Sequence, residues 1–144
     1  MEHILPIKTN TRKKTVTKKN NKIKLADDIK IILRAANVAE EKKGEDILLL
    51  DVSKLTVLSD YFLIITANSS AQIEAIASHI EDELRNSNCR LISKKGSSIS
   101  NWMILDFGNL IVHIMKQKER EFYKLERFWC NAITISKKQW EKAS

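Results

Sequence analysis

The chain has few of the residues that interrupt regular structure. Its 144 residues include three glycines and one proline, a composition that argues against a loop-dominated or low-complexity protein. The glycines stand alone at positions 44, 96 and 108, so the sequence has no glycine-rich loop of the kind that holds phosphates. It also lacks an apolar run long enough to cross a bilayer and the apolar stretch of a secretory signal. We therefore expect one compact domain with no membrane partner.

Residues that bind metals or carry out catalysis are also sparse. Cys89 and Cys130 lack the spacing of metal ligands, and their small number fits a reducing compartment. The three histidines, at positions 3, 79 and 113, form no local ligand pair, and His79 is interpreted as an exposed or hydrogen-bonded helical histidine. Asp46 and Asp51 lie on one predicted strand at an odd spacing, so they point to opposite faces. We expect no enzyme, no metal and no cofactor, although a Cys–His nucleophile pair stays open without support.

Positive charge is concentrated at the N-terminus. Residues 1–24 contain eight of the 25 lysines and arginines and one of the 18 acids, so this segment accounts for the whole formal charge of +7. Residues 25–144 are neutral overall, which argues against a basic nucleic-acid-binding domain. Because residues 1–24 show no apolar period, we predict a disordered basic arm followed by a domain over residues 25–144. The arm can be a solvated tail, a contact with RNA or an organellar transit peptide; unless it is the last, we expect a cytoplasmic protein.

Helical periodicity is clear in two segments. One helix is predicted to start near Leu25–Asp27 and to stop at Gly44. A second is predicted to start at Ser69 or Ser70, which can cap it, and to bury an apolar stripe of Ile73, Ile76, Ala77, Ile80 and Leu84. A third helix is expected over residues 118–129, and a short one after Ser136.

Short apolar runs predict the strands. Residues 46–52 and 61–67 are typical of buried strands, residues 89–93 could form a short one, and residues 130–135 are expected to be extended. Residues 102–115 are typical of a β-hairpin that turns at Gly108–Asn109. The order of these elements predicts an α/β fold: a single small domain with a mixed β-sheet of about five strands and flanking helices.

The predicted hairpin has two different faces, because side chains alternate along a strand. One face is wholly apolar and should belong to the core: Met103, Leu105, Phe107, Leu110, Val112 and Ile114. The other face is mixed: Trp102, Ile104, Asp106, Ile111, His113 and Met115. Either a helix of the same domain covers this mixed face, or the face is a docking surface, since Trp and Met are enriched at interfaces.

The segment after the hairpin carries aromatic and basic residues together. On a continuous helix, three residues at helical spacing would point inward: Phe122, Leu125 and Trp129. Four others would then lie at the rim or the surface: Arg120, Tyr123, Glu126 and Arg127. Aromatic residues close to arginine often mark a binding patch, whereas a helix with many i,i+4 charge pairs is the ordinary alternative.

The same stretch resembles a known family. The pattern W-x-x-L-D-F-G-x-x-x-V-H runs from Trp102 to His113, and E-R-x-F-Y-x-L-E-R-x-W runs from Glu119 to Trp129. Upstream, D-I-x-x-L-D-V covers residues 46–52 and S-D-Y-F covers residues 59–62. Together these motifs resemble the Iojap/ribosomal silencing factor family over about residues 26–133.

The resemblance implies a fold related to nucleotidyltransferases but without their active site. It also implies a partner, the fourteenth protein of the large ribosomal subunit (uL14), on the face that meets the small subunit. Occupying that face would block subunit association and repress translation, notably in starvation, while organellar relatives act in large-subunit assembly. Ribosomal RNA is then the RNA that the arm could contact. The motif and the strand alternation together predict the partner-binding residues: Trp102, Asp106, His113, Met115, Arg120 and Tyr123.

The chain departs from the family pattern at three places. A Gly-x-Ser-x-Arg-Gln run is replaced by residues 67–72, which lack the Gly and the Arg. Lys95 stands where Glu is usual, and Met115 stands where Phe is common. These departures put contacts near Ala71 and Lys95 in doubt and leave the hairpin motif intact. An assembly factor, a nucleotidyltransferase and an RNA-binding domain that uses the arm are the alternative functions, and the oligomeric state stays open.

Overall fold

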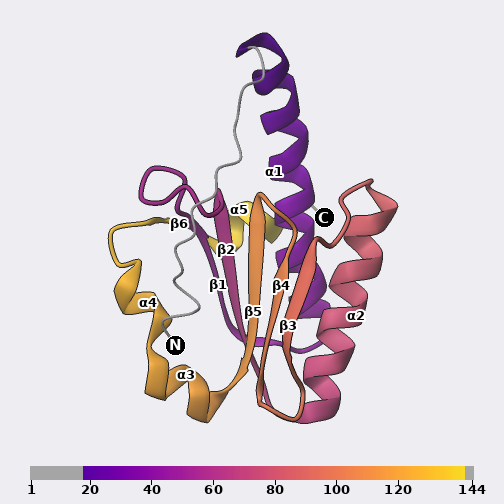
Figure 1. Ribbon diagram of the computed structural model, residues 1–144, viewed down its shortest axis with the longest axis vertical. Coiled ribbons are helices and arrows are strands. Elements are labelled where there is room, and N and C mark those ends of the chain that lie inside the picture. Colours follow the sequence, from indigo (N-terminus) through magenta and orange to yellow (C-terminus); the bar gives the residue numbers. More distant parts are fainter. Residues whose placement is uncertain (1–17, 142–144) are drawn as a thin grey trace.

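A computed structural model describes residues 18–141 of the chain, with side chains from residue 28 onward. Within this range one six-stranded sheet is flanked by helices (Figure 1). The helices are α1 (Lys18–Glu41), α2 (Ser70–Asn86), α3 (Gln117–Tyr123), α4 (Leu125–Phe128) and α5 (Lys137–Glu141). The strands are β1 (Glu45–Asp51), β2 (Tyr61–Ala67), β3 (Ser93–Ser97), β4 (Trp102–Asp106), β5 (Leu110–Lys116) and β6 (Ile133–Ile135).

The sheet is mixed, with the strand order β3-β4-β5-β2-β1-β6. β2 and β5 run parallel at its centre, and every other neighbouring pair is antiparallel. The predicted α/β fold with a mixed sheet and flanking helices is confirmed. The sheet has six strands where about five were expected, because part of the extended segment 130–135 pairs with the edge of β1, with Leu49 opposite Ile135.

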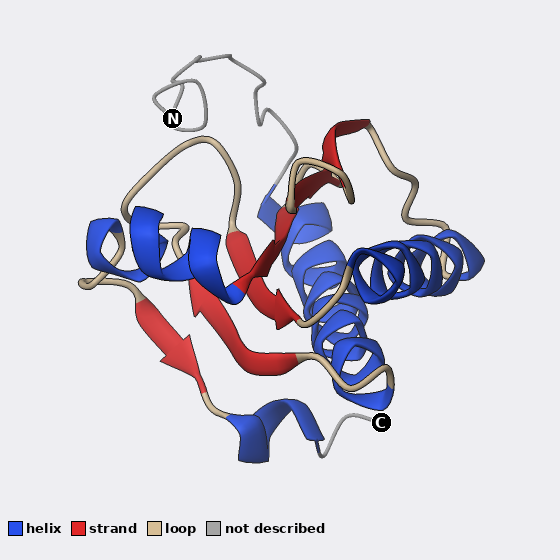
Figure 2. Cartoon of the chain, turned by 90° about the horizontal axis from the view of Figure 1, so that it is seen from below, coloured by secondary structure: helices blue, strands red, loops and turns tan. Residues whose placement is uncertain are grey.

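One face of the sheet is covered by α1 and α2, which contact each other (Figure 2). The N-cap predicted for α2 is confirmed: the Ser69 hydroxyl accepts a hydrogen bond from the Gln72 N–H at 3.1 Å. The predicted apolar stripe of α2 is buried in full, at Ile73, Ile76, Ala77, Ile80 and Leu84. Burial of each large side chain contributes about 1.5–3 kcal/mol, so this stripe holds α2 on the sheet.

The opposite face is covered in part by α3 and α4, which follow β5 (Figure 2). Beneath them lies a second core: Leu50, Val52, Phe62, Ile64, Met115 and Leu125. The prediction of one continuous helix over residues 118–129 is wrong. Lys124 adopts a left-handed conformation with φ 46° and separates α3 from α4, and a non-glycine residue there interrupts the helical path.

The break at Lys124 changes which side chains point inward. Leu125 is buried and Trp129 packs against the second core, as predicted. Phe122 instead is 77% exposed. Its predicted inward position is wrong, because the helical spacing from Phe122 to Leu125 does not continue across a left-handed residue.

Two predicted boundaries also differ from the structure. Helix α1 begins at Lys18 rather than near Leu25–Asp27, so its backbone takes in the end of the basic segment. The remainder of the predicted arm, residues 1–17, lies outside the described residues. The third strand occupies Ser93–Ser97 rather than residues 89–93. It pairs along β4 as an edge strand, where charged side chains are tolerated.

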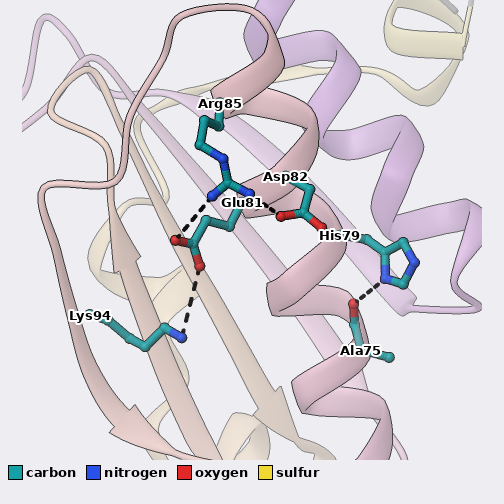
Figure 3. A network of polar contacts seen from close by, with 6 residues as sticks. All are labelled: Ala75, His79, Glu81, Asp82, Arg85 and Lys94. Carbon is teal, nitrogen blue, oxygen red and sulfur yellow. Dashed lines mark hydrogen bonds and ion pairs between the residues drawn. The ribbon is translucent and has the colours of Figure 1, made fainter.

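Edge strand β3 is tied to helix α2 by a small network of charges (Figure 3). The Lys94 ammonium lies 3.9 Å from the Glu81 carboxylate, which also faces Arg85, and Arg85 pairs with Asp82. Such exposed pairs contribute roughly 1 kcal/mol or less each. Their main consequence is directional: Lys94 points toward α2, so the next residue, Lys95, points to the other face of the sheet.

His79 lies on the exposed side of α2 and takes no part in a ligand cluster (Figure 3). Its Nδ1 atom is 2.7 Å from the carbonyl oxygen of Ala75 in the same helix. The interpretation of His79 as an exposed helical histidine is confirmed. In the described part of the chain, no helix is both long and apolar enough to cross a membrane.

Candidate docking face on the hairpin

β4 and β5 form the predicted hairpin, with Trp102 opposite Met115 and Asp106 opposite Ile111. The turn needs Gly108, which has φ 93°, a conformation that L side chains rarely adopt. The Asp106 carboxylate accepts a hydrogen bond from the Gly108 N–H at 2.8 Å and so stabilises the turn. Asp106, predicted as a contact residue, therefore also has a structural role.

The predicted division of the hairpin into two faces is confirmed on its apolar side. All six residues of that side are at most 5% exposed: Met103, Leu105, Phe107, Leu110, Val112 and Ile114. The mixed face is divided. Towards β5, His113 and Met115 are buried, whereas towards β4, Trp102, Ile104 and Asp106 keep part of their surface. Ile111 also keeps part of its surface, so two of the six residues of this face are covered and four are partly exposed.

The register extends the uncovered part across the edge of the sheet. Lys95 lies opposite Ile104, which in turn lies opposite His113, so these three side chains share one face. Ile104 belongs to neither apolar core. We call the uncovered residues of β3, β4 and β5 the open strip: Lys95, Trp102, Ile104, Asp106 and Ile111.

Helix α3 borders the open strip through a row of aromatic rings. The Tyr123 ring lies 4.7 Å from the Trp102 ring, and the exposed Phe122 ring lies 4.9 Å from Tyr123. Edge strand β3 fits closely behind Trp102: a Cβ atom on Gly96 would lie 2.1 Å from the Trp102 carbonyl oxygen. At the Trp102 end of the strip, three aromatic residues therefore lie in a row: Trp102 and Tyr123 are half-buried, and Phe122 is exposed.

Trp102 is held from beneath by a buried histidine. The indole Nε1–H donates a hydrogen bond to His113 Nδ1 at 3.2 Å, which requires the proton of the neutral imidazole to sit on Nε2. Burial and, to a smaller extent, the Arg120 guanidinium lower the pKa of His113 to about 4. The imidazole is therefore neutral at neutral pH and keeps its acceptor nitrogen available.

Arg120 was predicted at the rim or the surface, and this placement is wrong, because the residue is 8% exposed. Its Nη1 donates to the Thr66 hydroxyl at 2.9 Å, and its Nε donates to the Glu126 carboxylate at 3.2 Å. A buried cation needs such partners. Arg120 belongs to α3 and Glu126 to α4, so their ion pair spans the break at Lys124 and fixes the two short helices to each other and to β2.

The six residues predicted to bind a partner thus fall into two groups. Trp102, Asp106 and Tyr123 retain exposed surface and lie around the open strip. The other three form its support: His113, Met115 and Arg120. Two residues beside these, Phe122 and Lys95, could not be placed from the sequence. The polar segment around Lys95 has no strand pattern, and the break at Lys124 that exposes Phe122 has no sequence signal, since lysine is not a typical left-handed residue.

The described residues contain no group of three or more His, Cys, Asp or Glu side chains arranged to hold a metal ion. A cavity of about 460 Å³ lies where β1 meets α3 and α4, and acids and bases line it together: Asp46, Glu121, Glu126, Arg120 and Lys124. The arrangement on the hairpin is suited to recognition of another surface, because it joins a rigid sheet to partly exposed aromatic rings.

Comparisons with known proteins agree with the family resemblance of the sequence motifs. The family model described as "Ribosomal silencing factor during starvation" matches residues 25–144. The ribosomal silencing factor RsfS of Bacillus subtilis is 36% identical over 102 residues, which cover 71% of this chain and 86% of that protein. The chloroplastic protein Iojap of Zea mays is 36% identical over 110 residues, which cover 76% of this chain and 48% of that protein.

A solved structure shares the fold. The crystal structure of a protein from Chromobacterium violaceum superimposes with a TM-score of 0.66 at 31% identity, covering 69% of this chain and 82% of that one. The similarity therefore extends from the hairpin motif to most of the described sheet and helices.

Proposed function

This chain belongs to the ribosomal silencing factor family, and from that membership we propose that it binds the large ribosomal subunit through the fourteenth protein of that subunit (uL14). Binding there blocks association with the small subunit and represses translation. The observation that carries the proposal is the open strip, because four of its five residues lie in the segment of the family motif from Trp102 to His113.

Direct contact is assigned to the side chains with free surface. Trp102, Asp106 and Tyr123 are kept from the sequence prediction, and Phe122 and Ile104 are added. Partly exposed aromatic rings gain contact area at a small cost in side-chain entropy, which is why Trp and Tyr dominate interface energetics. The buried members of the predicted set support these residues from below: His113, Met115 and Arg120.

The basic N-terminal segment supplies a second contact, with ribosomal RNA. Residues 1–24 carry the whole formal charge of +7, while the domain that bears the open strip is neutral. Attraction to phosphates depends on charge and not on shape, so the segment can strengthen binding without choosing the site. We place the protein in the cytoplasm, or in an organelle if residues 1–24 are a transit peptide.

The proposal is for a factor that acts by occupying a surface and catalyses no reaction. Its support is the absence of a metal-holding cluster among the described side chains and of a glycine-rich loop in the sequence. The relation to the nucleotidyltransferase fold stays a proposal of ours. Assays for nucleotide transfer and hydrolysis with Mg²⁺ are expected to give no turnover.

Sedimentation of ribosomal subunits through sucrose tests the function. Added protein should move with the large subunit and decrease the fraction of joined ribosomes. Trp102→Ala should weaken binding roughly thirtyfold, since truncation of a central interface Trp costs about 2 kcal/mol or more. Val57→Ala is the matched control, because Val57 is 84% exposed and lies in the loop between β1 and β2.

Melting of the same variants separates docking from folding. Trp102→Ala should lower the free energy of unfolding by less than the roughly 3–5 kcal/mol typical of large core truncations, because Trp102 is only half-buried. Normal binding by the folded Trp102→Ala protein would contradict the docking face. Binding to the large subunit without any effect on joining would favour the alternative function, a factor for large-subunit assembly.

A further inference from the structure

We infer that His113 is a positioning residue for the docking face: it does not touch the partner and fixes the Trp102 indole in the orientation that binds. The inference rests on the proposed function and adds a role to it. A histidine that is 2% exposed cannot offer its ring to a partner without unfolding of its surroundings. Its Nδ1 atom nevertheless accepts the hydrogen bond from Trp102.

His113 is itself rigidly held. It lies in β5, a central strand that pairs with β2 on one side and with β4 on the other, opposite Ile64 and Ile104. Its ring packs edge-on against Phe62, with ring centroids 5.7 Å apart. A side chain fixed by packing on a central strand can act as a reference point for less constrained neighbours.

Trp102 needs such a reference point. It is the first residue of β4 and follows the loop that joins β3 to β4, and part of its side chain is exposed. Trp102 packs against the second core, its ring lies 4.7 Å from the Tyr123 ring, and its Nε1–H donates the hydrogen bond to His113. Tyr123 belongs to α3, whereas His113 belongs to the sheet, so the hydrogen bond fixes the indole directly to β5.

The bond also prepares Trp102 for a dry interface. When a partner covers the strip, an indole N–H without an acceptor would cost the full desolvation of that group. Because His113 already accepts the bond, the partner needs only to pack against the ring. The role also requires a hydrogen-bond acceptor at the Nδ1 position. An apolar residue of equal size could fill the same space but could not accept the bond.

Three variants test the assignment. His113→Leu keeps a similar volume and removes the acceptor, and His113→Asn keeps an acceptor near the Nδ1 position. Trp102→Phe removes the donor and keeps an aromatic ring. Affinity for isolated large subunits should fall about tenfold in His113→Leu, the loss expected for one hydrogen bond, and should be largely restored in His113→Asn. In the Trp102→Phe background, His113→Leu should have no further effect.

A spectroscopic measurement adds a signal that a purely structural role would leave unchanged. In an amide and indole nuclear magnetic resonance spectrum, the Trp102 Nε1–H signal is identified by its absence in Trp102→Phe. It should shift in His113→Leu while the Trp129 and Trp140 signals keep their positions. An unshifted Trp102 signal, or an equal loss of affinity with and without Trp102, would overturn the positioning role. If Trp102→Ala itself binds normally, the docking face fails instead, so the two failures are distinguishable.

Discussion

Single buried polar residues support the mixed face of the hairpin. His113 and Arg120 lie beneath that face, and each makes its hydrogen bonds inside the protein. Because a buried polar group is costly when it loses its partner, these residues make the face sensitive to changes that do not touch its surface.

The stability of the folded chain should depend on the protonation of His113. Its pKa is about 4 in the folded protein against an ordinary value of 6.5, so the unfolded chain takes up the proton first as the pH falls. The free energy of unfolding should therefore decrease below about pH 6.5 and stop changing from this source below about pH 4. Between about pH 7.5 and about pH 5 the loss is about 2 kcal/mol.

The measurement is urea unfolding across that pH range. His113→Asn is the comparison, since it removes the titrating group and leaves every carboxylate in place. The difference between the two profiles isolates His113. Parallel profiles would show that the imidazole titrates normally and is not buried as described.

Arg120→Leu should destabilise the fold by about 2 kcal/mol, because it leaves the Thr66 hydroxyl and the Glu126 carboxylate without their donor. This loss of stability is smaller than the loss expected for a fully buried ion pair, because the Glu126 side chain is 40% exposed. Urea unfolding of Arg120→Leu beside Arg127→Leu checks this. Arg127 is exposed on the same short helices, and its loss should stay within about 0.5 kcal/mol. Equal effects of the two changes would contradict the structural role of the Arg120 contacts with Glu126 and Thr66.

At the scale of elements, the sequence predicts what local patterns determine. The α2 stripe from Ile73 to Leu84 repeats with helical period, and the hairpin combines strict alternation with a turn pair at Gly108–Asn109. These elements form where they were predicted. Strand β3 was misplaced, because Ser93–Ser97 has polar residues of low strand propensity and is a strand only through its pairing with β4.

The extent of the open strip could not be predicted for a related reason. Alternation identifies the outer face of the hairpin, but the covered part of that face depends on the path of α3 and α4. The left-handed conformation at Lys124 directs that path, and tertiary contacts of Arg120 and Leu125 hold it. Local propensity contains no information about such contacts.

Strand β3 should tolerate no side chain at its single glycine. Gly96 has φ 76°, and its Cβ position is blocked by backbone, the Trp102 carbonyl oxygen. Gly96→Ala should therefore destabilise the protein by more than about 1 kcal/mol and shift the Trp102 indole signal. Thermal melting and the indole spectrum check this, with Ser98→Ala in the adjoining loop as control. An unchanged Trp102 signal would show that β3 does not hold the start of β4.

In the whole molecule, the net positive charge and the neutral folded domain lie in different parts of the chain. The neutral domain carries the open strip, whereas residues 1–24 carry the net charge. The first buried side chain of α1 among the described residues is Ile32. Affinity and position on the ribosome should therefore depend on different parts of the chain.

Removal of residues 1–24 should leave the melting temperature nearly unchanged and reduce the dependence of subunit binding on salt. Each lost phosphate contact lowers the slope of log affinity against log salt by about one. Binding titrations at several salt concentrations measure this. A full-length chain with the lysines and arginines of residues 1–24 replaced by glutamine separates charge from length. An unaltered slope would remove ribosomal RNA as a partner of this segment.

The strand order has a consequence for biosynthesis. The central strands β2 and β5 come together across α2, β3 and β4, and the edge strand β6 returns from the end of the described chain to β1. Such long-range pairing forms slowly, because the intervening chain must close before any contact stabilises it. During synthesis, the open strip and the helices beside it are completed only after α3 and α4 have emerged. If the open strip is the docking face that we propose, a growing chain presents no finished docking face until residues 117–128 have been made and have folded onto the sheet.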